Sequence, residues 1–355
     1  MVRRISVIGL VFVVIVLVGS WFVPSPTVLA QTTKAPASAA PTLTPTNEMV
    51  WRFVGGAANR KNPITEQLDL PFCNEVTQKS GGRLRLNFYL ATELGYSSGV
   101  LRPLKAGAVE MAAAQCGANS GDMPILGVFE LPTFFNSPEK LAKGYEATEA
   151  IWKRELAKWD IVPLGYYVIE EMVVLSKKPV NTLKDFDKLK IRAYYAELAD
   201  LLKALGASTV YVPFPEQYTA LQRGTIDATV TGPMTAVALS FWEVINHCTY
   251  GMSISYAPVM RAVSKTHFDK LPPDLQKIII DAGNVASAKS VKLANDMLAS
   301  DLQTLKAKGV TVVKVSNEDR ERIVQLAQQQ VWPNWRQRVG SVGEELMDTM
   351  AKAIR

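Results

Sequence analysis

Two observations predict a two-lobed α/β fold for this chain. Strand and helix patterns alternate along it, as they do where helices cover a largely parallel sheet. In addition, two stretches more than 100 residues apart, LKAGAVEMAAA from Leu104 and LQRGTIDATVT from Leu221, share the order leucine, glycine, acid and small residues. In each, a glycine ends a helix just before a strand, because glycine adopts left-handed backbone geometry at low cost. The repeat indicates two similar lobes, although any α/β protein makes such turns.

Length and composition are consistent with two globular domains. A chain of 355 residues suffices for two domains of ordinary size, and 48% hydrophobic with 20% charged residues is typical of a globular protein. Residues 31–355 carry 37 bases, which is the 39 of the whole chain less Arg3 and Arg4, against 33 acids. An excess this small and dispersed gives no reason to expect a nucleic-acid partner.

The first lobe is predicted to contain three strands and two helices. In GGRLRLNFYL, apolar residues alternate with polar ones, which is the period of a strand with one buried face. The order strand, helix, strand is typical of a parallel α/β layer. The expected strands are 49–57, 81–90 and 108–115, and the expected helices are 64–80, which contains Pro71, and 98–105.

The same order recurs in the second lobe. KLKIRAYY, STVYVPF and TIDATV have the composition of strands. Gly206 ends the helix before STVYVPF, and the next helix has Pro215 in its first turn and Gly224 at its end. The expected strands are 188–195, 208–214 and 225–230, and the expected helices are 196–206 and 215–224.

The last third is predicted to be mostly helical. Residues 272–309 begin with two prolines, end at a glycine and contain no interior proline. One continuous helix would measure roughly 50 Å at about 1.5 Å per residue, enough to lie across both lobes. A strand at 310–315 and helices at 316–331 and 341–354 follow, the first of them with Ser316 as its N-cap.

The N-terminus has the features of an export signal. Arg3 and Arg4 precede the apolar segment 5–23, and Ala30 completes a small-residue cleavage motif, so residues 1–30 are predicted to be a signal peptide. If uncleaved, the segment could anchor the protein in a membrane. Residues 31–48 are rich in Pro, Ala and Thr, which predicts a linker. Either way, the body of the protein is expected to be periplasmic or otherwise extracytoplasmic.

The sequence lacks the motifs of common catalytic sites. It contains no nucleotide-binding glycine loop, no G-x-S-x-G and no H-E-x-x-H. Cys73, Cys116 and Cys248 have no metal-ligand spacing, and they are expected mostly as buried small side chains, although one pair could form a disulfide. Adjacent Glu170 and Glu171 would face opposite ways on a strand and would not form an acid/base pair. The sequence therefore gives no support for an enzymatic function.

A two-lobed exported protein of this kind is suited to enclosing a small solute between its lobes. A carboxylate in a closed cleft needs a fixed counter-charge, and arginine supplies two parallel hydrogen bonds and stays ionised when desolvated. Arg192 ends the apolar strand LKI, where α/β sheets present ligand-binding groups. An arginine at a strand end could also simply face solvent.

The order of several motifs resembles the solute receptors of tripartite ATP-independent periplasmic (TRAP) transporters. The motifs are LKIR, GASTVYVPFPEQYTALQRGTIDAT, FWEV and KLPPDLQKIIIDA, preceded by SGGRLRLNFY, ELG, LKAGAVEMA and FELPTFF. Together they extend over nearly everything from Met49 to the C-terminus. The resemblance implies a periplasmic binding protein-like venus flytrap, with two α/β lobes joined by crossing strands and a long bridging C-terminal helix. The lobes would comprise residues 49–169 with about 257–300, and 170–256 with about 301–355.

The resemblance also implies the function. A TRAP receptor captures a small organic acid outside the cytoplasmic membrane and delivers it to membrane permease subunits, without chemistry. Two other classes stay open at this stage. One is a ligand-sensing module for a signalling partner, and the other, with less support, is an exported α/β enzyme.

Site residues follow from the same resemblance. Arg192 stands at the position that pairs with the ligand carboxylate, Phe214 at a position whose ring packs on the ligand, and Thr231 at a polar position. Phe214 could instead be core. Met172 stands where some members carry a second arginine, so one arginine with neutral donors would hold the ligand. Val230 stands where metal-assisted relatives have a glutamate, so no metal and no cofactor is expected.

The first lobe would supply further contacts. Asn59, Glu93 and Gln115 are expected as additional residues lining the cleft, and each could equally be a surface or loop residue. Trp242, in SFWEV, is expected to pack rather than to contact ligand.

Overall fold

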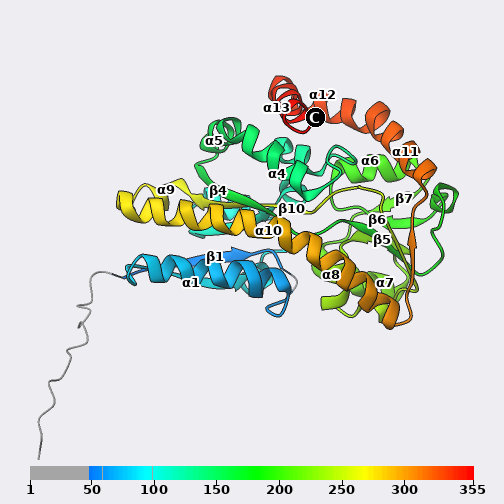
Figure 1. The fold of residues 1–355 in the computed structure, drawn as a ribbon, viewed down its shortest axis with the longest axis horizontal. Helices are drawn as coiled ribbons and strands as arrows, with labels where there is room; N and C mark the ends of the chain where they lie inside the picture. The colour runs from blue at the N-terminus through cyan, green and yellow to red at the C-terminus, as the bar shows by residue number, and fades with distance from the viewer. Residues whose placement is uncertain (1–47, 58, 98) are drawn as a thin grey trace, which may run out of the picture. The chain divides into compact units, whose positions relative to one another are not determined.

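The computed structural model describes residues 48–57, 59–97 and 99–355, and the described chain contains two β-sheets with helices around them (Figure 1). The predicted signal peptide, and the predicted linker up to residue 47, lie outside the described residues. Within the described part of the chain, every helix is too short or too polar to span a bilayer.

The first sheet contains β1 (Met49–Gly55), β2 (Leu84–Leu90), β3 (Met111–Gln115), β4 (Ile161–Val168) and β10 (Pro258–Ser264). Its order is β2-β1-β3-β10-β4. β1 pairs in parallel with β2 and β3, whereas β10 lies antiparallel between β3 and β4. The three strands predicted for the first lobe are confirmed, and their parallel pairing follows from the helices that connect them.

These connecting helices differ slightly from the prediction. The helix expected at 64–80 begins with a π-helical turn, η1 (Thr65–Asp69), and continues as α1 (Leu70–Lys79). Pro71 lies in the first turn of α1, where a missing N–H is best tolerated. The next helix, α2 (Leu101–Lys105), is shorter than the expected 98–105.

β3 begins at Met111, three residues later than predicted. The reason is Glu110, whose Oε2 accepts hydrogen bonds from the backbone N–H of Arg52 at 2.8 Å and from its Nε at 3.0 Å. The Glu110 carboxylate thus binds the Arg52 N–H of β1, which a neighbouring strand would otherwise pair. The ladder between β1 and β3 therefore begins only after Glu110, at Met111.

The second sheet has six strands, and the strands predicted for the second lobe are present but shorter than expected. Its order is β11-β9-β5-β8-β6-β7, with β6 parallel to β7 and β8, and β5 antiparallel to β8 and β9. The strands are β5 (Val173–Ser176), β6 (Lys190–Arg192), β7 (Ser208–Val210), β8 (Ala228–Thr231), β9 (His247–Tyr250) and β11 (Thr311–Lys314).

The two repeated glycines confirm the prediction for helix ends. Gly107, which follows α2, has φ +66°, and Gly224, which follows α7 (Gln217–Arg223), has φ +73°. Nothing lies within 4 Å of a Cβ built on Gly224, so the left-handed backbone rather than space requires glycine there. The physical basis of the repeat is therefore the sharp turn from each helix into a buried strand.

The chain passes between the two sheets along two neighbouring segments. Residues 169–172 join β4 to β5, and residues 251–257 join β9 to β10. The N–H of Met172 donates to the carbonyl of Ser255 at 2.8 Å, so the two segments are hydrogen-bonded to each other. The strands before residue 169, and β10, which begins at Pro258, belong to the first sheet, and the strands between these positions belong to the second. This division is compatible with the predicted change of lobe near 169 and 257, although the lobe boundaries themselves stay a prediction.

The predicted long helix is confirmed as α10 (Pro273–Ala307), which has 35 residues. Along its first two thirds, α10 buries Ile279, Ala282 and Leu293 in the core of the first sheet. Its last turns bury Leu302 and Leu305 in a core formed with the second sheet. Figure 1 shows α10, in yellow and orange, running alongside β4 and then past α8 (Pro233–Ala238).

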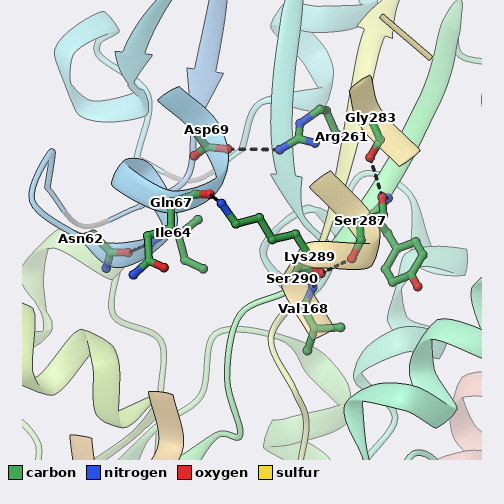
Figure 2. Close-up of polar contacts among 11 residues, drawn as sticks. Asn62, Ile64, Gln67, Asp69, Val168, Arg261, Gly283, Ser287, Lys289 and Ser290 are labelled. Atoms are coloured by element: carbon green, nitrogen blue, oxygen red, sulfur yellow. Dashed lines mark hydrogen bonds and ion pairs between the residues drawn. The ribbon is translucent and has the colours of Figure 1, made fainter. Parts of the chain in front are cut away.

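α10 also completes the hydrogen bonding of β4, which is an edge strand. The N–H of Tyr166 donates to Ser287 Oγ and the N–H of Val168 donates to Ser290 Oγ, each at 3.1 Å (Figure 2). A Cβ on Gly283 would lie 1.9 Å from the Leu164 carbonyl oxygen, so glycine is what lets the helix come this close. The two serines pair N–H groups that an edge strand leaves open.

The C-terminal helices contact the cores of both sheets, and the lobe to which they belong stays a prediction. The helices are α11 (Asn317–Leu326), α12 (Trp332–Val339) and α13 (Ser341–Ala353), and Ser316 caps α11 by accepting from Asp319 N at 3.0 Å, as predicted. Residues 301–355 were expected with the second lobe. Trp335 of α12 and Met350 of α13 join the core of the first sheet, because their apolar faces cover α4 (Pro138–Ala147) and neighbouring segments.

The three cysteines and Trp242 are packed in the protein interior, as expected. Cys73, Cys116 and Cys248 are free and buried, which confirms their prediction as small buried side chains. Trp242 packs against the core of the second sheet, also as predicted.

Candidate functional site

A cavity of about 280 Å³ lies among the strand ends of both sheets and the crossing segments. Gln115, Arg192 and Thr231 are the last residues of β3, β6 and β8, and all three line the cavity. Ligand-binding groups gather at carboxyl ends of strands in α/β proteins. The described lining residues are Gly56, Ala57, Asn62, Ile64, Ala91, Thr92, Ser97, Val100, Ala113, Gln115, Ile169, Glu170, Met172, Arg192, Tyr194, Phe214, Pro215, Thr231, Gly232, Thr235, Leu239, Ala257 and Val259.

Arg192 is fixed in the cavity wall by backbone carbonyls. Its Nε donates to Val212 O at 2.8 Å and its Nη1 to Val230 O at 3.4 Å, while its guanidinium carbon lies 4.7 Å from the ring centroid of Tyr194. The side chain is buried, which excludes the alternative of a solvent-facing arginine. Among the described residues it forms no ion pair. Burial lowers the pKa of Arg192 to about 10, so the guanidinium remains charged at neutral pH.

The other cavity residues predicted from the second lobe are neutral. Phe214 opens the short helix η5 (Phe214–Glu216) and is half-buried beside the cavity, so it is not a core residue. Thr231 and Met172 are buried in the wall. Val230 presents its carbonyl to Arg192 and has no side-chain group that could bind a metal.

The structure does not bring Asn59 and Glu93 to the cavity. Glu93 forms an ion pair with Arg60 at 2.7 Å and accepts from the N–H of Leu90 at 2.9 Å. Asn59 donates from Nδ2 to the carbonyl of Ala238 at 3.2 Å. Both side chains are held by partners far away in the sequence, and no periodicity could have indicated those partners.

Several lining residues were missed, Tyr194 among them, and Glu130, which does not itself line the cavity, orients both Tyr194 and the predicted Gln115. Glu130 is the last residue of the 3-10 helix η3 (Pro124–Glu130) and is fully buried. Its Oε2 accepts from Tyr194 Oη at 2.9 Å and from Ser255 Oγ at 3.0 Å. Its Oε1 accepts from the N–H of Gly117 at 2.7 Å and from Gln115 Nε2 at 3.4 Å. One signal was available, namely a single acid within the apolar stretch VFELP.

Glu130 should make folding stability depend on pH. Burial raises the pKa of Glu130 to about 7 from 4.5, so the folded state retains a proton that the unfolded chain has released. Stability therefore falls as pH rises through this interval, by at most about 1.4 kcal/mol per pH unit. Unfolding midpoints measured between pH 4.5 and 7 should change less for Glu130→Gln than for the unmodified protein. Parallel pH profiles for the two proteins would contradict this assignment.

Glu170 is a second buried acid, and unlike Glu130 it lines the cavity. In the sequence it was considered only as unfit for acid/base chemistry. Its carboxylate accepts from the N–H of Met234 and from Thr235 Oγ1, the latter at 3.2 Å, at the start of α8. Burial raises the pKa of Glu170 to about 8, and the negative charge of Asp301 on α10 acts in the same direction. Glu171 faces elsewhere and accepts from the N–H of Gly251 at 3.1 Å.

The arrangement can hold a small anion. It offers one buried guanidinium, neutral hydrogen-bonding side chains from Asn62, Gln115, Tyr194 and Thr231, and apolar walls. Among the described residues, no three His, Cys, Asp or Glu side chains are grouped so that they could hold a metal ion. The expectation that no metal is needed stays a prediction.

Fold and site together define a two-lobed solute-binding protein. Residues 54–338 match the family described as "Bacterial extracellular solute-binding protein, family 7", and the chain belongs to this family. The resemblance found in the sequence is thereby confirmed. The family consists of binding proteins that act outside the cytoplasm.

Individual relatives agree with this assignment. A solute-binding protein of Albidiferax ferrireducens is 25% identical over 294 residues, which are 80% of this chain and 85% of that protein. An extracytoplasmic solute receptor of Bordetella pertussis that binds pyroglutamic acid has the same fold, with a TM-score of 0.79 at 22% identity over 85% of this chain and 99% of that one. A TRAP periplasmic solute binding protein of Desulfovibrio salexigens with bound orotic acid gives 0.80 at 19% identity, over 86% of this chain and 98% of that one.

Proposed function

We propose that this protein is the extracytoplasmic receptor of a TRAP-type transporter, that it binds a small organic carboxylate in the cavity, and that it delivers this ligand to the membrane permease. The observation that carries the proposal is Arg192, a buried and charged guanidinium that lines the cavity and forms no ion pair among the described residues. A buried charge without a counter-charge is costly, and a ligand carboxylate would supply that counter-charge. The organic acids bound by the two solved relatives support the same class of ligand.

Binding would act through closure of the cavity. Its lining comes from the strands of both sheets and from both crossing segments, so a ligand contacts the whole set only when they are brought together. A ligand shifts a conformational equilibrium by as much as its affinity differs between the two states. The closed, ligand-bound form would be the form that the permease recognises. No chemical step is involved, and the ligand should be recovered from the protein with unchanged mass.

Export through residues 1–30, which are then removed, belongs to this proposal, with residues 31–48 as a Pro/Ala/Thr-rich linker. Mass spectrometry of the exported protein should find an N-terminus at Gln31, whereas an intact Met1 would indicate an uncleaved anchor.

Thermal unfolding against a panel of carboxylates tests the binding function. A ligand at about 100 times its dissociation constant adds about 2.7 kcal/mol of stability, which raises the midpoint of a protein of this size by several degrees. The panel should contain mono-, di-, keto-, hydroxy- and aromatic acids, each with its amide as control. The proposal fails if no acid raises the midpoint of protein that has been unfolded and refolded to remove co-purified ligand, or if the amides raise it equally.

A further inference from the structure

The lining of the cavity is largely apolar on both sides. Glycine, alanine and larger apolar residues make up more than half of the described lining residues. Val100 and Val259 line the cavity from the cores that cover the first sheet, and Met172 lines it from a core of the second sheet. The body of a ligand in this cavity would therefore contact hydrocarbon more than polar groups.

Several polar side chains of the lining are already engaged within the protein. Tyr194 Oη donates to Glu130 Oε2 at 2.9 Å and accepts from Gln115 Nε2 at 3.1 Å. Thr235 Oγ1 donates to Glu170 Oε1 at 3.2 Å, and the other Glu170 oxygen accepts a backbone N–H at the start of α8. A ligand hydroxyl would gain little from these groups, because it would have to replace bonds that exist.

Three buried side chains of the lining keep a polar atom without a partner among the described residues. Asn62 Oδ1 accepts from the N–H of Ile64 at 2.9 Å, which leaves Nδ2 as its unengaged group. Arg192 binds carbonyls through Nε and Nη1 and leaves Nη2 unengaged, as is Thr231 Oγ1. All three side chains are at most 4% exposed. Because a carboxylate would occupy Arg192, only Asn62, Thr231 and the Oε1 of Gln115 remain for the rest of a ligand.

We propose that the ligand is an organic acid with a largely apolar body, such as a short aliphatic or alicyclic acid, and that the cavity discriminates against polyhydroxylated acids of the same carbon number. This inference rests on the proposed function. An apolar body gains free energy when it leaves water, whereas a ligand hydroxyl buried without a partner loses its hydration and gains no bond in return. A six-carbon sugar acid has more hydroxyls than the lining has unengaged polar groups, so some of its hydroxyls would be buried unpaired.

The test compares acids that have equal carbon number and one carboxylate each. The probes are butanoate against threonate, hexanoate against gluconate, and cyclohexanecarboxylate against quinate. Their affinities are measured by calorimetry on protein that has been unfolded and refolded to remove co-purified ligand. In each pair that binds, the apolar acid should bind at least about tenfold more tightly than its polyhydroxylated counterpart.

Two valines of β10 provide a variant and its matched control. Val259 and Val263 are both buried in the core of the first sheet, but only Val259 lines the cavity. Threonine has nearly the shape of valine and adds a hydroxyl. Val259→Thr should weaken binding of the apolar acid that binds most tightly by at least about threefold, because such a ligand cannot hydrogen-bond the new hydroxyl. Val263→Thr should keep the affinity of the unmodified protein.

Three results overturn the inference. They are equal or tighter binding of the polyhydroxylated acid in the pairs, no binding of any of the three apolar acids, and an unchanged affinity in Val259→Thr. If Val259→Thr does not fold, the comparison within pairs decides alone. Equal binding within pairs leaves the proposed function intact, whereas failure of the whole carboxylate panel removes that function as well.

Discussion

Replacing Arg192 with alanine should lower the affinity for the carboxylate ligand by at least about thirtyfold, because truncating one partner of a buried charge pair costs about 2–5 kcal/mol. The side chain is 3% exposed, so water cannot replace it efficiently in the complex. Arg192→Lys should recover only part of the loss, since an ammonium group does not match both carboxylate oxygens in the way a guanidinium does. Calorimetric titration with a ligand found in the panel measures both variants.

Two controls separate this effect from loss of folding. Arg102 is also an arginine, but its side chain is 79% exposed, so Arg102→Ala should leave affinity unchanged. Because Arg192 also binds the carbonyls of Val212 and Val230, the unfolding midpoint of the ligand-free Arg192→Ala protein must be measured alongside. A folded Arg192→Ala protein with the original affinity would remove the basis of the proposed function.

Asp69→Ala should lower the free energy of unfolding by about 3–5 kcal/mol, because it leaves the Arg261 guanidinium buried without a counter-charge. The two side chains are fully buried and their charged atoms lie 3.4 Å apart (Figure 2). The guanidinium carbon of Arg261 also lies 4.2 Å from the ring centroid of Phe72 and 5.1 Å from that of Tyr167. Urea denaturation of the variant and the unmodified protein provides the measurement.

An exposed ion pair supplies the comparison. Arg154 and Glu345 lie 2.6 Å apart with side chains 49% and 45% exposed. Glu345→Ala should cost no more than about 1 kcal/mol. Adding Arg261→Met to Asp69→Ala should restore part of the stability, since an apolar side chain replaces the unpaired charge. A loss below about 1 kcal/mol in Asp69→Ala alone would show that the pair does not stabilise the fold.

Sequence reasoning was most successful where structure depends on neighbouring residues. The left-handed glycines Gly107 and Gly224 followed from the need to turn from a helix into a strand. The 35-residue helix α10 followed from a segment that begins with two prolines, ends at a glycine and contains no interior proline. Strand lengths were overestimated, and at the start of β3 the Glu110 side chain binds a backbone N–H of β1 that a strand ladder would otherwise use.

Gln115, Arg192 and Thr231, the predicted residues at strand ends, line the cavity, whereas Asn59 and Glu93, which were also predicted, do not. Gln115, Arg192 and Thr231 share a position, the last residue of a strand, that a pattern can reveal. Glu93 and Asn59 are also polar and close to strand ends, but Arg60 and the carbonyl of Ala238 engage them.

The sequence by itself determined the order of elements, the turns at the two glycines, the family and the position of Arg192, since each depends on local backbone preference or on motifs in a fixed order. Only the tertiary structure decided which acids are buried in the cavity wall, as Glu170 is, or behind it, as Glu130 is. Glu130 and Glu170 are tolerated there because hydrogen-bond donors from other segments surround them, namely Tyr194 and Ser255 for the first and the start of α8 for the second. Burial and partners of this kind are properties of three-dimensional neighbours, which spacing along a chain does not encode.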